Sequence, residues 1–282
     1  MTSDADLPES ESLRAVRWTI DGPVAIVTLH RPHRANAWNG TMHAEFIAVM
    51  HGLEHRDGLR AVVVTGSGST FSVGGDSQAL GDHAERGSYD TGLDDDIVRP
   101  GAPLRSEYDD DLAWMLGYRL PIIAAVNGAV AGVSLALVCF CDLRFGSAPA
   151  KFTTAAPKLG LPAEYGLSWT LPRLIGTTRA ADLLLSGRVI TVADTADWGL
   201  WNEVLPDGET TLEAAVSYAR LLAATTGPEA VSNAKAQIHG DWLRPDPAAS
   251  VRESKALLDQ AMGTAEYREG IAAFVEKRQP RF

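Results

Sequence analysis

Short apolar runs alternate along the chain with segments whose apolar residues recur at helical spacing. Residues 24–29 (VAIVTL) and 61–66 (AVVVTG) are rich in β-branched residues, which indicates buried strands. From residue 39 to about residue 60, apolar side chains recur every three or four positions, as they do on one face of a helix. Because a strand, a helix and a second strand in this order form parallel sheets, the pattern predicts an α/β fold.

The segment 81–106 differs from its surroundings because it is rich in Asp, Gly and Pro. Structureless segments of this length are uncommon outside functional loops, so we expect a long mobile loop or a partial helix near a site. Further elements expected from the apolar pattern are a helix over about 109–118, a buried strand from residue 122, helices over 180–185 and 211–224, and helices without strands from residue 228 onward.

Residues 121–141 carry no charged side chain, and this length is close to that of a membrane-spanning helix. The stretch nevertheless contains Pro121, Asn127 and several small polar or glycine residues, and its first part, IIAAV, has the pattern of a buried strand. We therefore expect it to form buried core, and we expect no membrane partner.

Composition and charge narrow the possible functions. The 282 residues include 25 Lys and Arg against 36 Asp and Glu, and a net charge of −11 gives no general attraction to nucleic acid. The first 15 residues are acidic and polar without an apolar run, so we expect a disordered leader rather than a signal peptide. Two cysteines, in C-F-C, are too few for a disulfide framework or a zinc site, and a cytoplasmic location fits best.

Three short motifs resemble catalytic signatures, but each lacks a required part. Residues 51–55 fit H-x-x-E-H without a third metal ligand, so we expect an exposed helix face and no metal. Residues 66–68 begin a glycine-rich loop, but neither the third glycine nor a helix follows. Residues 132–136 resemble a nucleophile elbow, but the single downstream histidine, His239, lies in a polar helical region.

Six longer segments carry a family resemblance when they are taken together. They are residues 24–39 (VAIVTLHRPHRANAWN), 62–76 (VVVTGSGSTFSVGGD), 121–145 (PIIAAVNGAVAGVSLALVCFCDLRF), 151–176 (KFTTAAPKLGLPAEYGLSWTLPRLIG), 183–206 (LLLSGRVITVADTADWGLWNEVLP) and 274–282 (FVEKRQPRF). In this order they resemble the crotonase, or enoyl-CoA hydratase/isomerase, superfamily. The resemblance runs from residue 24 to the end of the sequence.

The resemblance implies a fold and an assembly. Residues 16–215 are expected to form the crotonase (ClpP-like) core, an α/β spiral of repeated ββα units, after the leader at 1–15. Residues 216–282 are expected to form a C-terminal helical region that builds a homotrimer or a hexamer, a dimer of trimers.

It also implies an oxyanion hole for a thioester. An acyl-CoA that reacts beside its carbonyl develops negative charge on the thioester oxygen, and two backbone N–H groups can stabilise this enolate. The positions that match the two donors of the family are Gly75, in VGGD, and Gly132, in NGAVAG. If a helix begins at Gly132, its N-terminal dipole adds to the stabilisation.

The residues expected to move protons depart from the hydratase pattern. The two positions that carry glutamates in hydratases of the family are Ala136 and Ala156 here, and alanine can neither hold a proton nor orient water. The segment LGLPAEYG resembles a loop in which dienoyl-CoA isomerases carry an acidic residue, and Glu164 occupies that position. We expect Glu164 to be the base or acid, with Tyr165 and Ser134 as possible helpers.

The resemblance further implies where the coenzyme A part of the substrate binds. The loop positions of R-P-x-x-x-N-A are held by Arg31, Arg34, Ala35 and Ala37, and the basic residue near the C-terminus is Lys277. Ala35 replaces a basic residue that is common there. Gly74 and Asp76, on either side of Gly75, complete the expected contacts with the CoA ester, and we also expect Asp76 to cap a helix.

These observations lead to an enzyme of the enoyl-CoA hydratase/isomerase type that acts on an acyl-CoA in fatty-acid or related breakdown. The loss of both hydratase glutamates favours double-bond isomerisation with one carboxylate. No cofactor is expected beyond the coenzyme A of the substrate. The alternatives are a non-catalytic protein that binds CoA esters, or another crotonase chemistry such as hydrolysis or decarboxylation.

Overall fold

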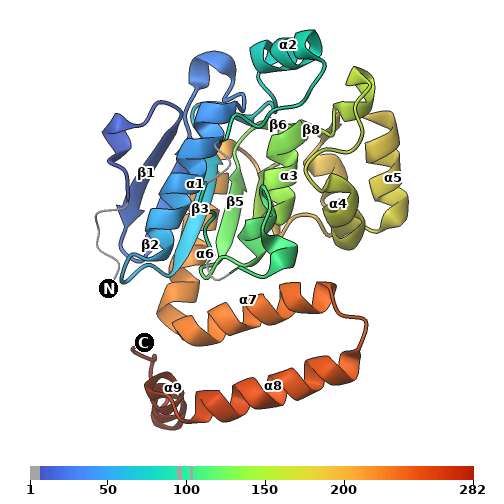
Figure 1. Cartoon of the computed structure of the whole chain (residues 1–282). Helices are drawn as coiled ribbons and strands as arrows, with labels where there is room; N and C mark the ends of the chain where they lie inside the picture. The colour runs from blue at the N-terminus through green and yellow to red at the C-terminus, as the bar shows by residue number, and fades with distance from the viewer. Residues whose placement is uncertain (1–6, 94–96, 102–103) are drawn as a thin grey trace.

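A computed structural model describes residues 7–93, 97–101 and 104–282, which form two sheets surrounded by helices (Figure 1). The larger sheet contains, in spatial order, β1 (Val16–Asp21), β2 (Val24–Leu29), β3 (Ala61–Gly66), β5 (Ile122–Val126), β7 (Leu143–Ser147) and β10 (Glu203–Leu205). The smaller sheet contains β4 (Thr70–Ser72), β6 (Ala129–Ala131), β8 (Lys151–Thr153) and β9 (Ile190–Thr191). The helices are α1 (Gly40–Glu54), α2 (Ser77–Arg86), α3 (Gly132–Phe140), α4 (Leu167–Ile175), α5 (Thr177–Ser186), α6 (Gly208–Thr225), α7 (Pro228–Trp242), α8 (Pro247–Met262) and α9 (Ala265–Glu276).

The chain repeats a strand–strand–helix unit, as the resemblance implies. In successive units the first strand joins the larger sheet and the second joins the smaller sheet: β3 and β4, then β5 and β6, then β7 and β8. The strands of one unit pair in parallel with those of the next in both sheets. The predicted α/β spiral of ββα units is therefore confirmed.

The central strands β3 and β5 of the larger sheet are buried on both faces, which explains their apolar runs. Alternate residues of β3 point to opposite sides: Val62 and Val64 join the main core with α1 and α3, and Ala61 and Val63 pack towards α6. The stretch 121–141 forms β5, β6 and α3 within this core, as expected. In the part of the chain that is described, none of the helices is long and apolar enough to cross a membrane.

The parallel pairing of the small sheet determines where the candidate site lies. Strands β4, β6 and β8 run in the same direction side by side, so the turns that follow them meet at one edge. A methyl group added at Gly74, after β4, would lie 2.7 Å from the carbonyl oxygen of Ala131, the last residue of β6. Segments that are about 60 residues apart in the sequence therefore touch through their backbones.

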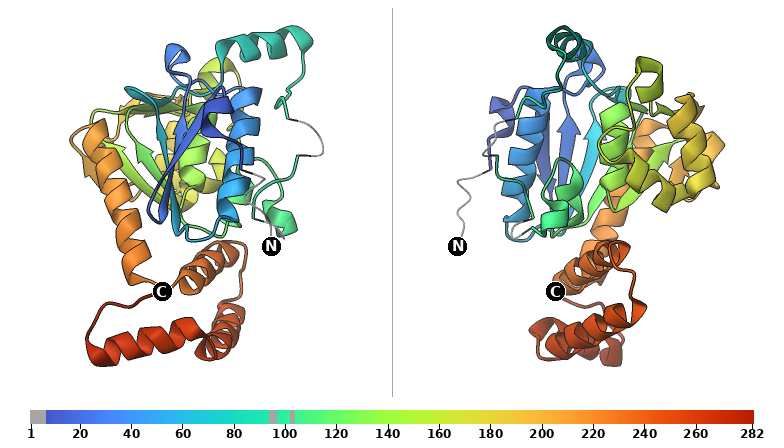
Figure 2. Two further views of the ribbon diagram at one scale, coloured as in Figure 1. Left: turned by 90° about the vertical axis from the view of Figure 1, so that its left-hand side faces the viewer. Right: turned by 45° about the vertical axis from the view of Figure 1, so that its right-hand side comes forward.

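Helices α7, α8 and α9 extend away from the core at the end opposite α2 (Figures 1 and 2). The boundary expected between residues 215 and 216 falls inside α6, whose Ala215, Val216 and Ala219 pack on the larger sheet. The helices that leave the core are thus α7 to α9. Their role in oligomerisation remains a prediction.

Two expectations of local structure differ from the structure. Residues 7–15 are not a free leader, because the backbone N–H groups of Ala15 and Val16 donate to the Glu45 carboxylate of α1 and Ala15 is buried. Residues 1–6 lie outside the described residues. The helix expected over 109–118 is only a 3₁₀ turn at Ala113–Leu116, because Leu112 adopts a left-handed backbone that interrupts a regular helix.

Candidate active site

The segment after β4 presents a backbone N–H group that has no hydrogen-bond acceptor among the described residues. Gly74 accepts a hydrogen bond from the Trp38 N–H, and the Asp76 N–H donates to the Trp38 carbonyl. Both contacts point towards Trp38, so the intervening Gly75 N–H points away from it. The Gly75 N–H donates none of the hydrogen bonds recorded among the described residues. Gly74 needs its left-handed φ of +86° and has no room for a side chain.

Gly132 is the residue that joins β6 to α3. It is the first residue of the helix, so its N–H has no acceptor within the helix. Its φ of +51° is a left-handed conformation that favours glycine. The helix behind it is entirely buried, and the positive end of its dipole lies at this edge.

Glu164 lies beside Gly132. A methyl group added at Gly132 would be 3.0 Å from Glu164 Oε2, so the carboxylate occupies the space that a side chain would fill. Burial raises the pKa of the Glu164 carboxyl above its usual value. None of the hydrogen bonds recorded for the described residues uses this carboxylate, and its backbone carbonyl accepts from the Leu167 N–H at the start of α4. The structure therefore places an uncompensated, partly desolvated carboxylate at the edge where Gly74, Gly75 and Gly132 meet.

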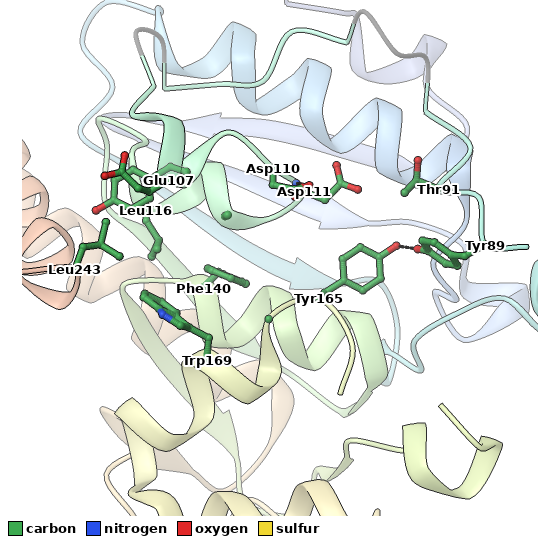
Figure 3. A pocket seen from close by; sticks show the side chains of 13 residues that line it. Tyr89, Thr91, Glu107, Asp110, Asp111, Leu116, Phe140, Tyr165, Trp169 and Leu243 are labelled. Carbon is green, nitrogen blue, oxygen red and sulfur yellow. Dashed lines mark hydrogen bonds between the residues drawn. The ribbon is translucent and has the colours of Figure 1, made fainter. Parts of the chain in front are cut away.

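Tyr165, the next residue, lines two cavities. Its backbone is left-handed (φ +43°), its hydroxyl is hydrogen-bonded to that of Tyr89, and burial raises its pKa to about 12 (Figure 3). One cavity, of about 610 Å³, is lined by Glu164 and by aliphatic residues of α2 and of the loop before Glu164. The other, of about 550 Å³, lies on the side of Phe140 and Trp169. Both tyrosines line both cavities.

Comparisons with known proteins identify relatives of this chain. The family model described as enoyl-CoA hydratase/isomerase matches residues 19–282. The chain is 35% identical to the "Probable enoyl-CoA hydratase" of Rhodobacter capsulatus, over 96% of this chain and 98% of that protein. It is 32% identical to the 1,2-epoxyphenylacetyl-CoA isomerase of Escherichia coli, over 93% and 96%. The structure of an enoyl-CoA hydratase from Polaromonas matches with a TM-score of 0.82 at 28% identity, over 95% of this chain and 99% of the other. The chain belongs to the enoyl-CoA hydratase/isomerase family.

This family member has alanines at the two positions that face the turns after β6 and β8. Ala136 lies one turn into α3 from Gly132, and Ala156 begins the 3₁₀ turn that follows β8. Both are buried and carry no ionisable group. Ser134 is fully buried, at 0% exposure, and shares a hydrogen bond of 2.6 Å with Ser72, so a helper role at the substrate does not fit its position.

Arg34 and Asp76, expected to contact the CoA ester, bind each other. Arg34 Nη2 lies 2.9 Å from Asp76 Oδ1, and Arg31 Nη1 lies 2.9 Å from Asp76 Oδ2. The predicted capping role of Asp76 is confirmed, because its side chain accepts from the Gln78 N–H at the start of α2. Burial alone would raise the pKa of Asp76, but the bonds from Arg34, Gln78 and Arg31 lower it to about 2. The sequence motifs gave no indication that the two arginines share one carboxylate.

The remaining expected CoA contacts are spread across the enoyl-CoA hydratase/isomerase chain. Ala35 has a left-handed backbone (φ +50°) in the loop beside Arg34, and Ala37 is buried with its carbonyl bound by Arg31. Lys277 is the residue that follows α9, and α9 and α2 lie at opposite ends of the molecule (Figure 1). A single copy of the chain therefore does not bring Lys277 to the glycine edge.

The partial motifs in the sequence have structural roles. Glu54 of H-x-x-E-H accepts the backbone N–H groups of Gly101 and Arg119, and it is buried rather than on the exposed face that we expected. No group of side chains in the described ranges could hold a metal ion. Carbonyl groups of the loop at 66–68 accept from Asn36 and Asn127, and β4 follows in place of a helix.

Proposed function

We propose that the protein is an isomerase that moves a double bond in an acyl-CoA through an enolate, with Glu164 as the single proton carrier. The observation that carries the proposal is the position of the Glu164 carboxylate against Gly132. One carboxylate is sufficient for isomerisation, because the same group can remove a proton from one carbon and return it to another.

The reaction starts with a 3-enoyl-CoA whose thioester oxygen lies between the N–H groups of Gly75 and Gly132. The Glu164 carboxylate takes a proton from C2, and the electron pair of that C–H bond spreads to the thioester oxygen. The two N–H groups stabilise this charge, and losing one such donor typically costs about 2.7–4 kcal/mol. The electrons then return to form the C2–C3 double bond, and the electron pair of the original C3–C4 double bond takes the proton back from Glu164 to form a C–H bond at C4.

Several observations support Glu164 in this role. Its raised pKa makes it a stronger base than an ordinary solvated glutamate. One relative of the chain is named an isomerase of a CoA ester, 1,2-epoxyphenylacetyl-CoA. In addition, Ala136 and Ala156 supply no second carboxylate for the addition of water.

A second candidate follows from the same two alanines. A protein without hydratase glutamates could bind CoA esters without converting them, or direct the enolate to hydrolysis or decarboxylation. The carboxylate beside Gly132 favours catalysis over binding alone. A partly desolvated charge without a hydrogen bond among the described residues lowers the stability of the fold, and such groups are typical of catalytic sites.

The test is a product analysis. The protein is incubated with a 3-enoyl-CoA and, separately, with a 2-enoyl-CoA, and products are separated by liquid chromatography with mass detection. We expect interconversion of the two esters without a mass change. A gain of one water would identify a hydratase, and release of free CoA would identify a hydrolase. Unchanged esters that nevertheless bind would identify a binding protein.

A further inference from the structure

The cavity of about 550 Å³ beyond the Tyr89–Tyr165 pair, here called the acidic cavity, has two unlike walls (Figure 3). Its apolar wall contains Phe140 of α3, Trp169 of α4, Leu116 and Leu243. Its polar wall contains Thr91, Glu107, Asp110 and Asp111. The other cavity, which contains Glu164, has a mainly aliphatic lining that includes Leu80, Leu159 and Leu161, so the polar wall is a distinct feature of the acidic cavity.

Two carboxylates of the polar wall, those of Asp111 and Glu107, lie beside arginines, whereas that of Asp110 has no ion pair among the described residues. Asp111 Oδ1 lies 3.2 Å from Arg99 Nη2, and Glu107 Oε1 lies 3.8 Å from Arg105 Nη2. Each of these carboxylates thus already has a cation on one side. Because a carboxylate has about four lone-pair sites, the oxygens can accept further hydrogen bonds. Asp111, which already has Arg99 on one side, therefore suits a neutral donor such as a hydroxyl group better than a second cation.

Two buried polar groups without hydrogen-bond partners among the described residues lie at this wall and directly behind it. Tyr108 lines the cavity at 4% exposure, and its hydroxyl has no hydrogen-bond partner. His43, at 1% exposure, has no partner on either ring nitrogen, and its Nε2 is 3.9 Å from Asp111 Oδ1. Buried polar groups are normally satisfied, so an unpaired phenol at this wall and an unpaired imidazole behind it are more typical of a functional site than of ordinary core.

We propose that the acidic cavity receives the acyl group of the substrate, and that this acyl group carries a hydroxyl that donates to the Asp110–Asp111 wall. This inference rests on the proposed function, because it takes the Glu164 edge as the place of the thioester. An unsubstituted alkyl chain would remove water from the carboxylates without replacing its hydrogen bonds. Sites built to bind a hydroxyl discriminate strongly against analogues that lack it.

The first test uses two unreactive ligands with equal numbers of acyl heavy atoms, 6-hydroxyhexanoyl-CoA and heptanoyl-CoA. Their affinities for the wild-type protein are measured by isothermal titration calorimetry. We expect the hydroxylated ester to bind at least about tenfold more tightly. Equal binding, tighter binding of heptanoyl-CoA, or no binding of either ester would overturn the inference.

The second test locates the discrimination. In Asp110→Asn and Asp111→Asn, the preference for the hydroxylated ester should fall several-fold, because an amide offers one acceptor oxygen where a carboxylate offers two. The matched control is Asp109→Asn, a neighbouring carboxylate outside the cavity lining whose side chain is largely exposed. A preference that survives both cavity variants, or that falls equally in the control, would contradict the assignment.

The binding test is separable from the test of isomerisation. 6-Hydroxy-3-hexenoyl-CoA and 3-heptenoyl-CoA, assayed in parallel, report on catalysis. If the hydroxylated ligand is preferred but neither enoyl ester isomerises, the proposed function fails and the cavity assignment stands. If both esters isomerise equally well and bind equally well, the cavity assignment fails and the isomerase remains.

Discussion

At the scale of single residues, the Glu164 carboxylate has lost water without gaining a recorded hydrogen bond among the described residues. Burial raises its pKa above the ordinary glutamate value, so the folded protein holds this proton more tightly than the unfolded chain does. The free energy of unfolding therefore falls as pH rises from the ordinary value through the raised one. A functional charge at this position lowers the stability of the protein at neutral pH.

The variant Glu164→Gln should consequently be more stable than wild type at pH 7.5, and the advantage should shrink towards pH 4.5, where the carboxyl gains its proton. Urea unfolding at the two pH values measures the difference. Glu213→Gln, on an exposed position of α6, is the control and should leave the free energy of unfolding unchanged within about 0.5 kcal/mol. A Glu164→Gln variant that is less stable at pH 7.5 would mean that the carboxylate has a structural partner.

Residue roles were predictable where the cause is local. The capping role of Asp76 follows from a short acidic side chain directly after a tight turn, and the structure confirms it. The contact of Tyr165 with Tyr89 and that of Asp111 with His43 join residues about 70 positions apart. Such contacts cannot be predicted from the pattern of a single sequence, because they arise only when the tertiary fold packs distant segments together.

At the scale of elements, strands were easier to predict than short helices. β2 and β3 coincide with the expected runs at 24–29 and 61–66, because strands that are covered on both faces are mostly apolar and therefore stand out in the sequence. The helix expected at 109–118 failed because the left-handed backbone of Leu112 breaks it. Such a conformation depends on what the residue packs against, and Leu112 is fully buried.

Helix α7 is tied to the core by a buried charged cluster. Asp142, just after α3, accepts from Lys235 Nζ at 2.7 Å and contacts His239 Nε2 at 2.8 Å. Burial opposes the negative charge, but the positive charge of Lys235 and the bond to His239 lower the pKa of Asp142 below its usual value. Removing one partner of such a pair leaves an uncompensated buried charge.

We therefore expect Lys235→Met to destabilise the protein by about 3–5 kcal/mol at pH 7. Part of the loss should disappear below pH 4, where protonation of Asp142 removes the unpaired charge. Urea unfolding curves provide the measurement, and Lys255→Met on the exposed surface of α8 serves as the control. A loss no larger than that of the control would show that the cluster does not hold α7 on the core.

At the scale of the whole molecule, helices α7 to α9 extend away from the core (Figure 2), and α9 leaves apolar side chains exposed. Phe274 of α9 is 82% exposed, and Val275 and Ile271 are exposed beside it. Large exposed apolar groups of this kind are typical of association surfaces. They agree with the trimer or hexamer that the family resemblance implies, and a second copy would also be the source of a Lys277 near the glycine edge.

Sedimentation velocity tests this expectation. Wild-type protein should sediment as a trimer or hexamer, and Phe274→Asp should shift the population towards smaller species, because a charge at an apolar interface loses its hydration. Val98→Asp, at an exposed valine outside these helices, is the control. A wild-type monomer, or an assembly that Phe274→Asp leaves intact, would contradict the assignment of this surface.

The central claim, that Glu164 moves the proton of an enolate, has one direct measurement. Wild type and Glu164→Gln are incubated in heavy water with a saturated acyl-CoA and with a 3-enoyl-CoA, and deuterium at C2 is followed by mass spectrometry. Glutamine keeps the size of the side chain but cannot accept the proton, so we expect exchange to slow by about 10²–10⁴-fold, with Glu213→Gln exchanging like wild type. Exchange at the wild-type rate in Glu164→Gln would contradict the account and place the base elsewhere.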